Sequence, residues 1–234
     1  MLITLLIVVI LCVAFWLAWR DYRGWLALGK GGLPGTLRGW VTVTRLRLAK
    51  TDPLDLSLMV PEMGGPDDHA YLDRLPPRNG PRPRIAPWPI PHRQCDQFIA
   101  SGIRGRLDAL FDHKVTENAA IVHYQQSHFE KHSPAITLCH PECGHAHARF
   151  GRGEIAHVHP GDGSMHMIFS ASDAAEVVKA GWGERHPLAG VRPLLPSTYI
   201  YVYPPRDDTE LAVVHSLLDA SVAHMSKGSA PAAQ

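Results

Sequence analysis

The segment Glu154–Gly190 reads EIAHVHPGDGSMHMIFSASDAAEVVKAGWGERHPLAG, and its pattern decides the fold class. Two short β-prone runs, residues 154–159 and 165–170, flank the tetrapeptide Pro-Gly-Asp-Gly. Clustered proline, aspartate and glycine favour a tight turn, so this stretch predicts a β-hairpin. From Gly181 onward the bare pattern predicts only a loop that follows a helix.

Helices and further strands are predicted around the hairpin. Asp173, with Glu176 three residues later, forms a capping-box pattern that predicts the start of a helix. Apolar spacing predicts another helix over residues 98–111, and Asp207 opens a last one. Short strands are expected at residues 119–124, 135–139 and 198–203. This grouping indicates an α+β domain, in which an antiparallel sheet is packed by helices.

The first nineteen residues, Met1–Trp19, carry no charged side chain. As a helix they would span about 28 Å, close to the hydrocarbon thickness of a bilayer. The basic start and small-residue cleavage site of a signal peptide are not found in this stretch. Residues 20–50 hold seven basic side chains and one acidic one, which places the body on the cytosolic side. We expect a single-pass membrane protein; a buried core helix is the alternative.

A proline-rich stretch separates this transmembrane helix from the predicted domain. Residues 75–91 contain seven prolines, which favour an extended, partly polyproline conformation. Ile85, Trp88 and Ile90 indicate that the stretch packs on the domain, and Thr36 is expected to cap a short helix before it. The expected organisation is an anchor at 1–19, a basic juxtamembrane and proline-rich segment at 20–92, the α+β domain at 93–225 and a disordered tail at 226–234.

Composition narrows the function through charge, cysteine and histidine. A net charge of +1 argues against nucleic acid as the main partner. The four cysteines, one of them inside the apolar N-terminal run, fit a reducing compartment. Fifteen histidines are an excess, and ten of them lie between His113 and His166. Because histidine titrates near neutrality and is a common metal ligand, this concentration favours a chemical site over scattered histidines.

The densest histidine motif lies in the predicted hairpin. His157 and His159 are two residues apart on a strand, so they share one face, where buried imidazoles need partners. If Val158 opposes His166, then His166 faces away; a one-residue bulge would instead pair His166 with His159. The motif therefore predicts a functional pocket, and a metal bound by these imidazoles is a possible variant of it.

Three stretches of the chain closely resemble fungal luciferase and its many non-luminous relatives. They read EIAHVHPGDGSMHM, DAAEVVKAGWGERHPLAG and YVYPPRDDTELAVV. Weaker matches are RDYRGWL, RGWVTV, LPPRNGPRPRI ending in RQ, and HFEKH at His128–His132. The resemblance covers most of the chain between Arg20 and Met225, and it identifies a member of the fungal luciferase (3-hydroxyhispidin luciferase) family.

The resemblance implies a membrane-associated enzyme that adds molecular oxygen to 3-hydroxyhispidin, an enolic α-pyrone. The resulting endoperoxide loses carbon dioxide, with emission of light in the luminous members. No organic cofactor is expected, and oxygen is the co-substrate, because an enolate can hand an electron to oxygen directly. Such chemistry needs a base for the enol and fixed positive charge for the developing oxyanion.

Within the matching segments the resemblance implies roles for particular residues. The candidates for the base and the positive charge are His157, His159, His166, His186 and Arg185. The candidates for substrate binding are Trp182, Glu130, His132 and Glu154. Each glutamate can orient an imidazole or pair with an arginine, and a structural role is favoured for Glu154. Trp182 can stack on a flat substrate, whereas core packing is the more common role of a buried tryptophan.

The chain departs from the luciferase pattern at residues 139–147, which read CHPECGHAH. Thiolates and imidazoles this close together can chelate zinc, although the spacing is not a common zinc signature. An exposed variable loop is the favoured interpretation. The weaker metal candidates in it are Cys139, Cys143, His145 and His147.

Three functions are therefore compatible with the sequence. The first is oxygenation of a flat enolic small molecule delivered from the lipid bilayer, with or without light. The second is a metal-dependent enzyme that uses His157, His159 and His166. The third is a non-catalytic, membrane-tethered domain that binds a small molecule. Protein partners are unknown from the sequence.

The anchor leads to a test of localisation. Deletion of Met1–Trp19 removes the uncharged run, so we expect the protein to move from the membrane fraction to the soluble fraction. Fractionation followed by immunoblotting measures the shift. A truncated chain that stays on membranes would assign the attachment to residues 33–50 instead.

Overall fold

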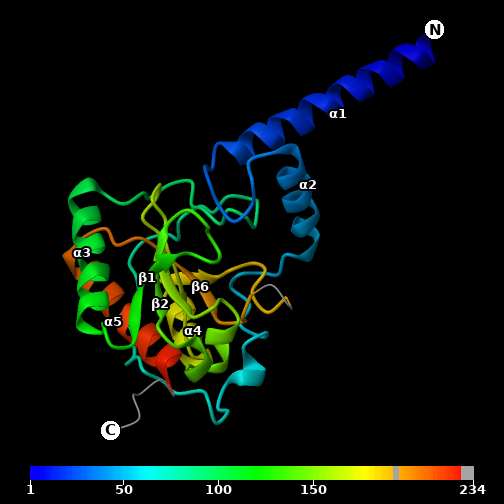
Figure 1. The fold of residues 1–234 in the computed structure, drawn as a ribbon. Helices are drawn as coiled ribbons and strands as arrows, with labels where there is room; N and C mark the ends of the chain where they lie inside the picture. Colours follow the sequence, from blue (N-terminus) through cyan, green and yellow to red (C-terminus); the bar gives the residue numbers. More distant parts are fainter. Residues whose placement is uncertain (192–194, 228–234) are drawn as a thin grey trace.

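A six-stranded antiparallel sheet forms the centre of the protein (Figure 1). The computed structural model describes residues 1–191 and 195–227. The strand order is β1-β2-β3-β4-β6-β5. The strands are β1 (Val122–Gln126), β2 (Pro134–Leu138), β3 (Glu154–Val158), β4 (Met165–Ile168), β5 (Gly183–Arg185) and β6 (Tyr199–Val202). The α+β class is confirmed, and the predicted strands lie within a few residues of the observed ones.

Helices α3 and α5 pack against each other, and α5 lies against β3 and β4. The five α-helices are α1 (Leu2–Leu26), α2 (Leu37–Leu46), α3 (Ser101–Glu117), α4 (Ala171–Lys179) and α5 (Asp208–Ser226). Short 3₁₀ turns lie at η1 (Arg47–Ala49), η2 (Val60–Glu62), η3 (Pro141–Cys143) and η4 (Ala146–Arg149). The main core between helices and sheet includes Met165 and Met167 of β4 and Leu218 of α5, all without solvent exposure.

The β3–β4 hairpin has a register that the sequence did not reveal. His157 lies opposite His166, and Val158 lies opposite Met165, so both registers considered above are wrong. The hairpin is extended by a hydrogen bond from the His159 amide to the Ser164 carbonyl, at 2.8 Å. Because opposed residues share a face, His157 and His166 lie together on the side of the sheet away from the methionines.

A bulge in β3 changes which side chains meet on that face. Ala135 and Thr137 of β2 share one face, and they lie opposite His157 and Glu154 respectively. Ile155 is the extra residue at this register shift. Simple alternation would put Glu154 and His157, three residues apart, on opposite faces. The bulge instead places both on the same face.

Two local predictions between β4 and β6 are wrong. Ser170, two residues after the end of β4, caps α4 by accepting a hydrogen bond from the Asp173 amide at 3.1 Å, so Asp173 lies in the first turn. The Asp173 carboxylate accepts hydrogen bonds from the backbone amides of Tyr71 and Leu72 instead. The stretch after Gly181 is strand β5 and not a loop, because tertiary pairing with β6 supplies hydrogen bonds that no local pattern announces.

Helix α1 is long and apolar enough to cross a membrane, with a mean hydropathy of 2.9 in its most apolar window and none of that window buried. It projects from the body in Figure 1. The helix continues past Trp19 and ends at Leu26. Trp25, near this end, is buried with Val43 of α2, Ala86 and Trp88 in a second, smaller core. The Trp25 indole donates to the Ile90 carbonyl at 2.8 Å.

The ends of the other predicted elements are close to the observed ones. Thr36 caps α2 by accepting from the Gly39 amide at 3.3 Å, and Asp207 caps α5. The predicted disordered tail begins inside α5, which ends at Ser226. Residues 228–234 of that tail lie outside the described residues.

Candidate functional site

Five buried imidazoles meet beside the histidine face of the sheet. His166 of β4 is central: its ring centroid lies 4.9–5.5 Å from the centroids of the other four rings. Each of these five histidines is at most 4% exposed to solvent. We call this set the histidine chamber; its members are His92, His157, His159, His166 and His186.

A chain of hydrogen bonds crosses one side of the chamber. Oε1 of Glu154 lies 2.5 Å from Nδ1 of His157, and Nε2 of His157 lies 3.2 Å from Nε2 of His159. On the far side of His159, Nδ1 lies 2.7 Å from Oγ of Ser164, which donates to Asp162 at 2.6 Å. The rings of His157 and His159 are therefore each held between two polar partners, and a proton has a continuous path along these hydrogen bonds.

Glu154 orients an imidazole and stays ionised. Burial opposes its ionisation, but the charge and hydrogen bond of His157 outweigh burial and lower the pKa of the Glu154 carboxyl. Ser127 and the amide of His128 also donate to the carboxylate. The favoured structural role for Glu154 thus gives way to an orienting role, as in other carboxylate–histidine pairs.

The buried positive charge next to the chamber is Arg93, which the sequence analysis missed. Its guanidinium donates twice to Glu130, at 2.5 and 3.2 Å, and Oε1 of Glu130 lies 3.7 Å from Nε2 of His159. Burial alone would lower the pKa of Arg93, but the pairing with Glu130 raises it. The RQ that ends the weaker LPPRNGPRPRI match was the available signal.

Arg185 lies on the opposite face of the sheet. On β5, Glu184 pairs with Tyr201 and Arg185 pairs with Ile200, so the two side chains point to different sides. The Arg185 guanidinium donates to the carbonyls of Asp52, Asp55 and Ala189. These bonds hold residues 52–55 against the domain. Among the described residues the guanidinium donates no hydrogen bond to a chamber imidazole, and its charge acts on His186 only by helping to lower the pKa of that ring.

Two other predicted residues lie outside the chamber. Trp182 belongs to the main core, and its indole donates to the Pro76 carbonyl at 2.7 Å, so it packs and does not face the chamber. His132 is exposed. In their place the structure supplies His92 from the proline-rich segment and Tyr199, which stacks on His166 at 4.5 Å. No local motif marked either residue.

Burial keeps three of the chamber imidazoles neutral. It lowers the pKa of His159, His166 and His186 well below the ordinary value, and neighbouring positive groups add to the effect. Among the residues that the structure describes, Nδ1 of His92 and Nδ1 of His166 have no hydrogen-bond partner. Neutral imidazoles with free nitrogens can accept a proton or bind a metal.

A cavity of about 270 Å³ adjoins the chamber. This volume lies just below the usual range of about 300–1,000 Å³ for small-molecule sites. Its polar lining includes His92, His128, His166, His186, Tyr199, Glu130 and Lys131. Its apolar lining includes Ile90, Phe129, Leu188 and Leu195.

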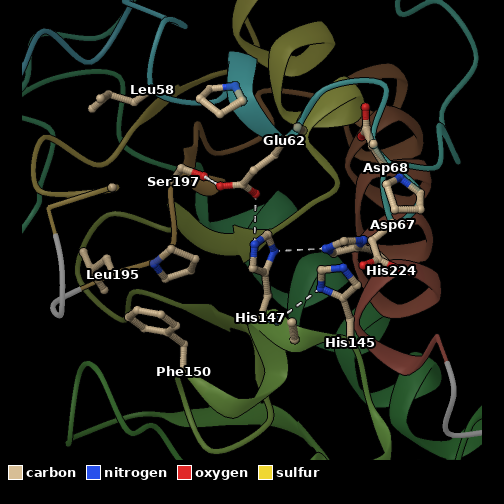
Figure 2. A pocket seen from close by; sticks show the side chains of 17 residues that line it. Leu58, Glu62, Asp67, Asp68, His145, His147, Phe150, Leu195, Ser197 and His224 are labelled. Carbon is tan, nitrogen blue, oxygen red and sulfur yellow. Dashed lines mark hydrogen bonds and ion pairs between the residues drawn. The ribbon is translucent and has the colours of Figure 1, made fainter.

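The CHPECGHAH segment does not form a cysteine–histidine site. Cys143 is exposed, and Sγ of Cys139 lies 3.5 Å from Nδ1 of His123. His145 and His147 meet His224 of α5 instead, beside a larger pocket (Figure 2).

Comparison with known proteins gives a consistent match. The family model described as Luciferase domain matches residues 152–221. The luciferase of Armillaria gallica is 33% identical over 228 residues, which cover 91% of this chain and 83% of that protein. The luciferase of Neonothopanus nambi is 31% identical over 236 residues, which cover 95% and 86% respectively. No solved structure gives a significant match.

The neutral chamber predicts a loss of stability in acid. Below about pH 6.5 the unfolded chain protonates His159, His166 and His186, whereas the folded chain does not, because their folded pKa values are lowered. The free energy of unfolding therefore falls as pH falls, by up to about 1.4 kcal/mol per pH unit for each histidine. Chemical unfolding in detergent between about pH 7 and pH 5 measures this slope.

A matched pair of variants assigns the slope to the chamber. His166→Gln is expected to reduce the slope of the free energy of unfolding against pH by about 1.4 kcal/mol per pH unit. The control His132→Gln, at an exposed histidine, is expected to leave this slope unchanged. Equal slopes in all three proteins would show that the chamber imidazoles already exchange protons in the folded state.

Proposed function

This chain belongs to the fungal luciferase family, and from that premise we propose that it is a membrane-anchored enzyme that adds molecular oxygen to a flat, enolic pyrone. The observation that carries the proposal is the group of buried, neutral imidazoles that lines a cavity of small-molecule size. Oxygen is the co-substrate, and no organic cofactor is required, because an enolate can reduce oxygen by one electron.

The first step is removal of the enol proton. His166 lines the cavity, is neutral and has a free Nδ1 among the described residues, so it is the proposed general base. The ring of His157 lies 5.3 Å away by centroids, and Glu154 holds that ring. His157 and Glu154 act as positioning residues behind the base and stabilise the proton once it has moved.

The second step is the reaction of the enolate with oxygen. One electron passes from the enolate to oxygen, and the substrate radical and superoxide combine into a peroxide at carbon. The negative charge on oxygen is stabilised by the imidazole that has taken up the enol proton. Burial of the site slows release of the reactive intermediate to water.

Attachment to the bilayer suits an apolar, flat substrate. Trp25 at the end of α1 donates to the carbonyl of Ile90, and Ile90 lines the cavity. The wall of the cavity is therefore joined to the apolar helix by one hydrogen bond, which supports delivery of the substrate from the membrane in this proposal. The excess of basic residues over residues 20–50 supports a cytosolic position of the body in this proposal.

Oxygen uptake with 3-hydroxyhispidin tests the proposal. Replacement of the base in His166→Gln is expected to lower kcat by about 100-fold, because general base catalysis contributes about that much or more. The control His132→Gln changes an exposed histidine and is expected to keep wild-type uptake. Emitted light is recorded in the same assay as a separate readout, since oxygenation does not require an excited product.

The outcomes separate the proposed functions. Wild-type protein that binds the pyrone and consumes no oxygen would be a binding domain, and the enzymatic proposal would fail. Equal uptake by wild type and His166→Gln would remove His166 from the role of base.

A metal-dependent enzyme is the second candidate, and one observation favours it. Two groups of three chamber imidazoles, which share His166, each bring ligand nitrogens within 4.8 Å of one another. The first group, His92, His166 and His186, also lines the cavity. Three imidazoles beside a cavity are a ligand set that suits zinc, iron or copper.

Oxygen uptake before and after removal of metals by chelation distinguishes the two candidates. The cofactor-free proposal expects the purified protein to keep full oxygen uptake after its metals are removed by chelation. Loss of uptake on chelation, with recovery on addition of one metal equivalent and no recovery in His166→Gln, would establish the metal-dependent enzyme instead.

A further inference from the structure

A second group of histidines lies outside the histidine chamber. His145 and His147 come from the start of η4, and His224 comes from the last turn of α5 (Figure 2). One ligand nitrogen from each residue lies within 4.8 Å of the other two. The three imidazoles border a pocket of about 600 Å³ that the proposed oxygenation does not use.

The spacing of two of these nitrogens matches a tetrahedral metal site. Nδ1 of His147 lies 3.2 Å from Nε2 of His224. Two nitrogens bound to zinc at 2.0–2.1 Å with a tetrahedral angle are separated by about 3.3 Å. The pair is therefore already placed as one edge of a zinc coordination tetrahedron.

A carboxylate orients one of the imidazoles from behind. Oε2 of Glu62 lies 3.1 Å from Nε2 of His147, and Ser197 donates a hydrogen bond to the same carboxylate. Burial raises the pKa of Glu62, but the bonds from His147 and Ser197 outweigh it and lower the pKa overall. Metal-bound histidines commonly donate their second N–H to a carboxylate in this way, which fixes the tautomer with Nδ1 free.

The other two imidazoles carry unsatisfied buried nitrogens. Nε2 of His145 and Nδ1 of His224 have no hydrogen-bond partner among the described residues. Of these two atoms, Nε2 of His145 is the one available to an ion shared with the nitrogens of His147 and His224. The three rings pack together with centroids 4.1–5.3 Å apart, and a shared cation would give this buried nitrogen a partner.

We propose that His145, His147 and His224 bind one zinc ion, with the fourth coordination position open to the adjoining pocket. His147 binds through Nδ1, His224 through Nε2 and His145 through Nε2. Nδ1 of His145 accepts from the His147 amide at 3.1 Å, and this contact lengthens when Nδ1 takes the ring proton on metal binding. Asp67 and Asp68 also line the pocket and add negative charge near the cation.

Such an ion would connect segments that are far apart in the sequence. The ligands come from η4 and from the end of α5, and Glu62 adds the end of η2. A three-histidine site with an open position also activates water in zinc enzymes, so the pocket can accommodate a ligand of the metal. The proposal is independent of the oxygenase, because the site shares no residue with the histidine chamber.

Zinc binding by the full-length protein in detergent tests the proposal. After chelation and dialysis, titration with Zn²⁺ is expected to give one equivalent bound and to raise Tm by roughly 5 °C at a Zn²⁺ concentration about 100-fold above Kd. His147→Gln and His224→Gln are each expected to lose the bound ion and the rise in Tm. His215→Gln changes an exposed histidine of the same helix and is expected to bind as the wild type does.

Two more variants keep the result interpretable. His166→Gln disrupts the histidine chamber and is expected to leave this zinc equivalent in place. Glu62→Gln keeps all three ligands and is expected to weaken zinc binding by roughly 10-fold, even if the ligand variants fail to fold. Wild-type protein that binds no zinc, or zinc that is lost in His166→Gln and kept in His224→Gln, would overturn the proposal.

Discussion

The hydrogen bond between Glu154 and His157 is the contact on which the rest of the chamber depends. It exists because a bulge at Ile155 turns Glu154 to the face that His157 occupies. From His157 the hydrogen bonds continue to His159, and the hairpin register places His166 opposite His157. A carboxylate and a group of imidazoles buried without these contacts would be costly, since buried polar groups need partners.

The chamber is completed by a segment that has almost no regular structure. The proline-rich stretch and the residues after it supply His92 and Arg93, whose partners Glu184 and Glu130 come from the domain. The same stretch holds the end of α1 through Trp88 and the carbonyl of Ile90. Proline lacks a backbone donor and cannot join the sheet, so this stretch is free to run across the domain and connect the apolar helix to the site.

The two histidine groups differ in the polar partners that surround their imidazole rings. In the chamber, carboxylates lie beside three of the imidazoles, those of His92, His157 and His159, and the cavity is lined by His166 and His186 among others. In the second group a single carboxylate, Glu62, holds one imidazole while nitrogens of the other two remain without partners. This difference in partners is the reason why we propose proton transfer for the first group and cation binding for the second.

The sequence by itself determined the elements whose signals are local. Alternation, turn residues and caps predicted the hairpin, the α+β class, the start of α5 and the apolar N-terminal helix, because these depend on neighbours a few residues apart. Only the tertiary structure decided the register of β3 and β4, the bulge at Ile155, and the pairing that makes β5 a strand. It also identified Arg93, and not the predicted Arg185, as the arginine paired with Glu130 beside the chamber, and it brought His224 next to His147. Contacts between residues tens of positions apart leave no local pattern in the sequence.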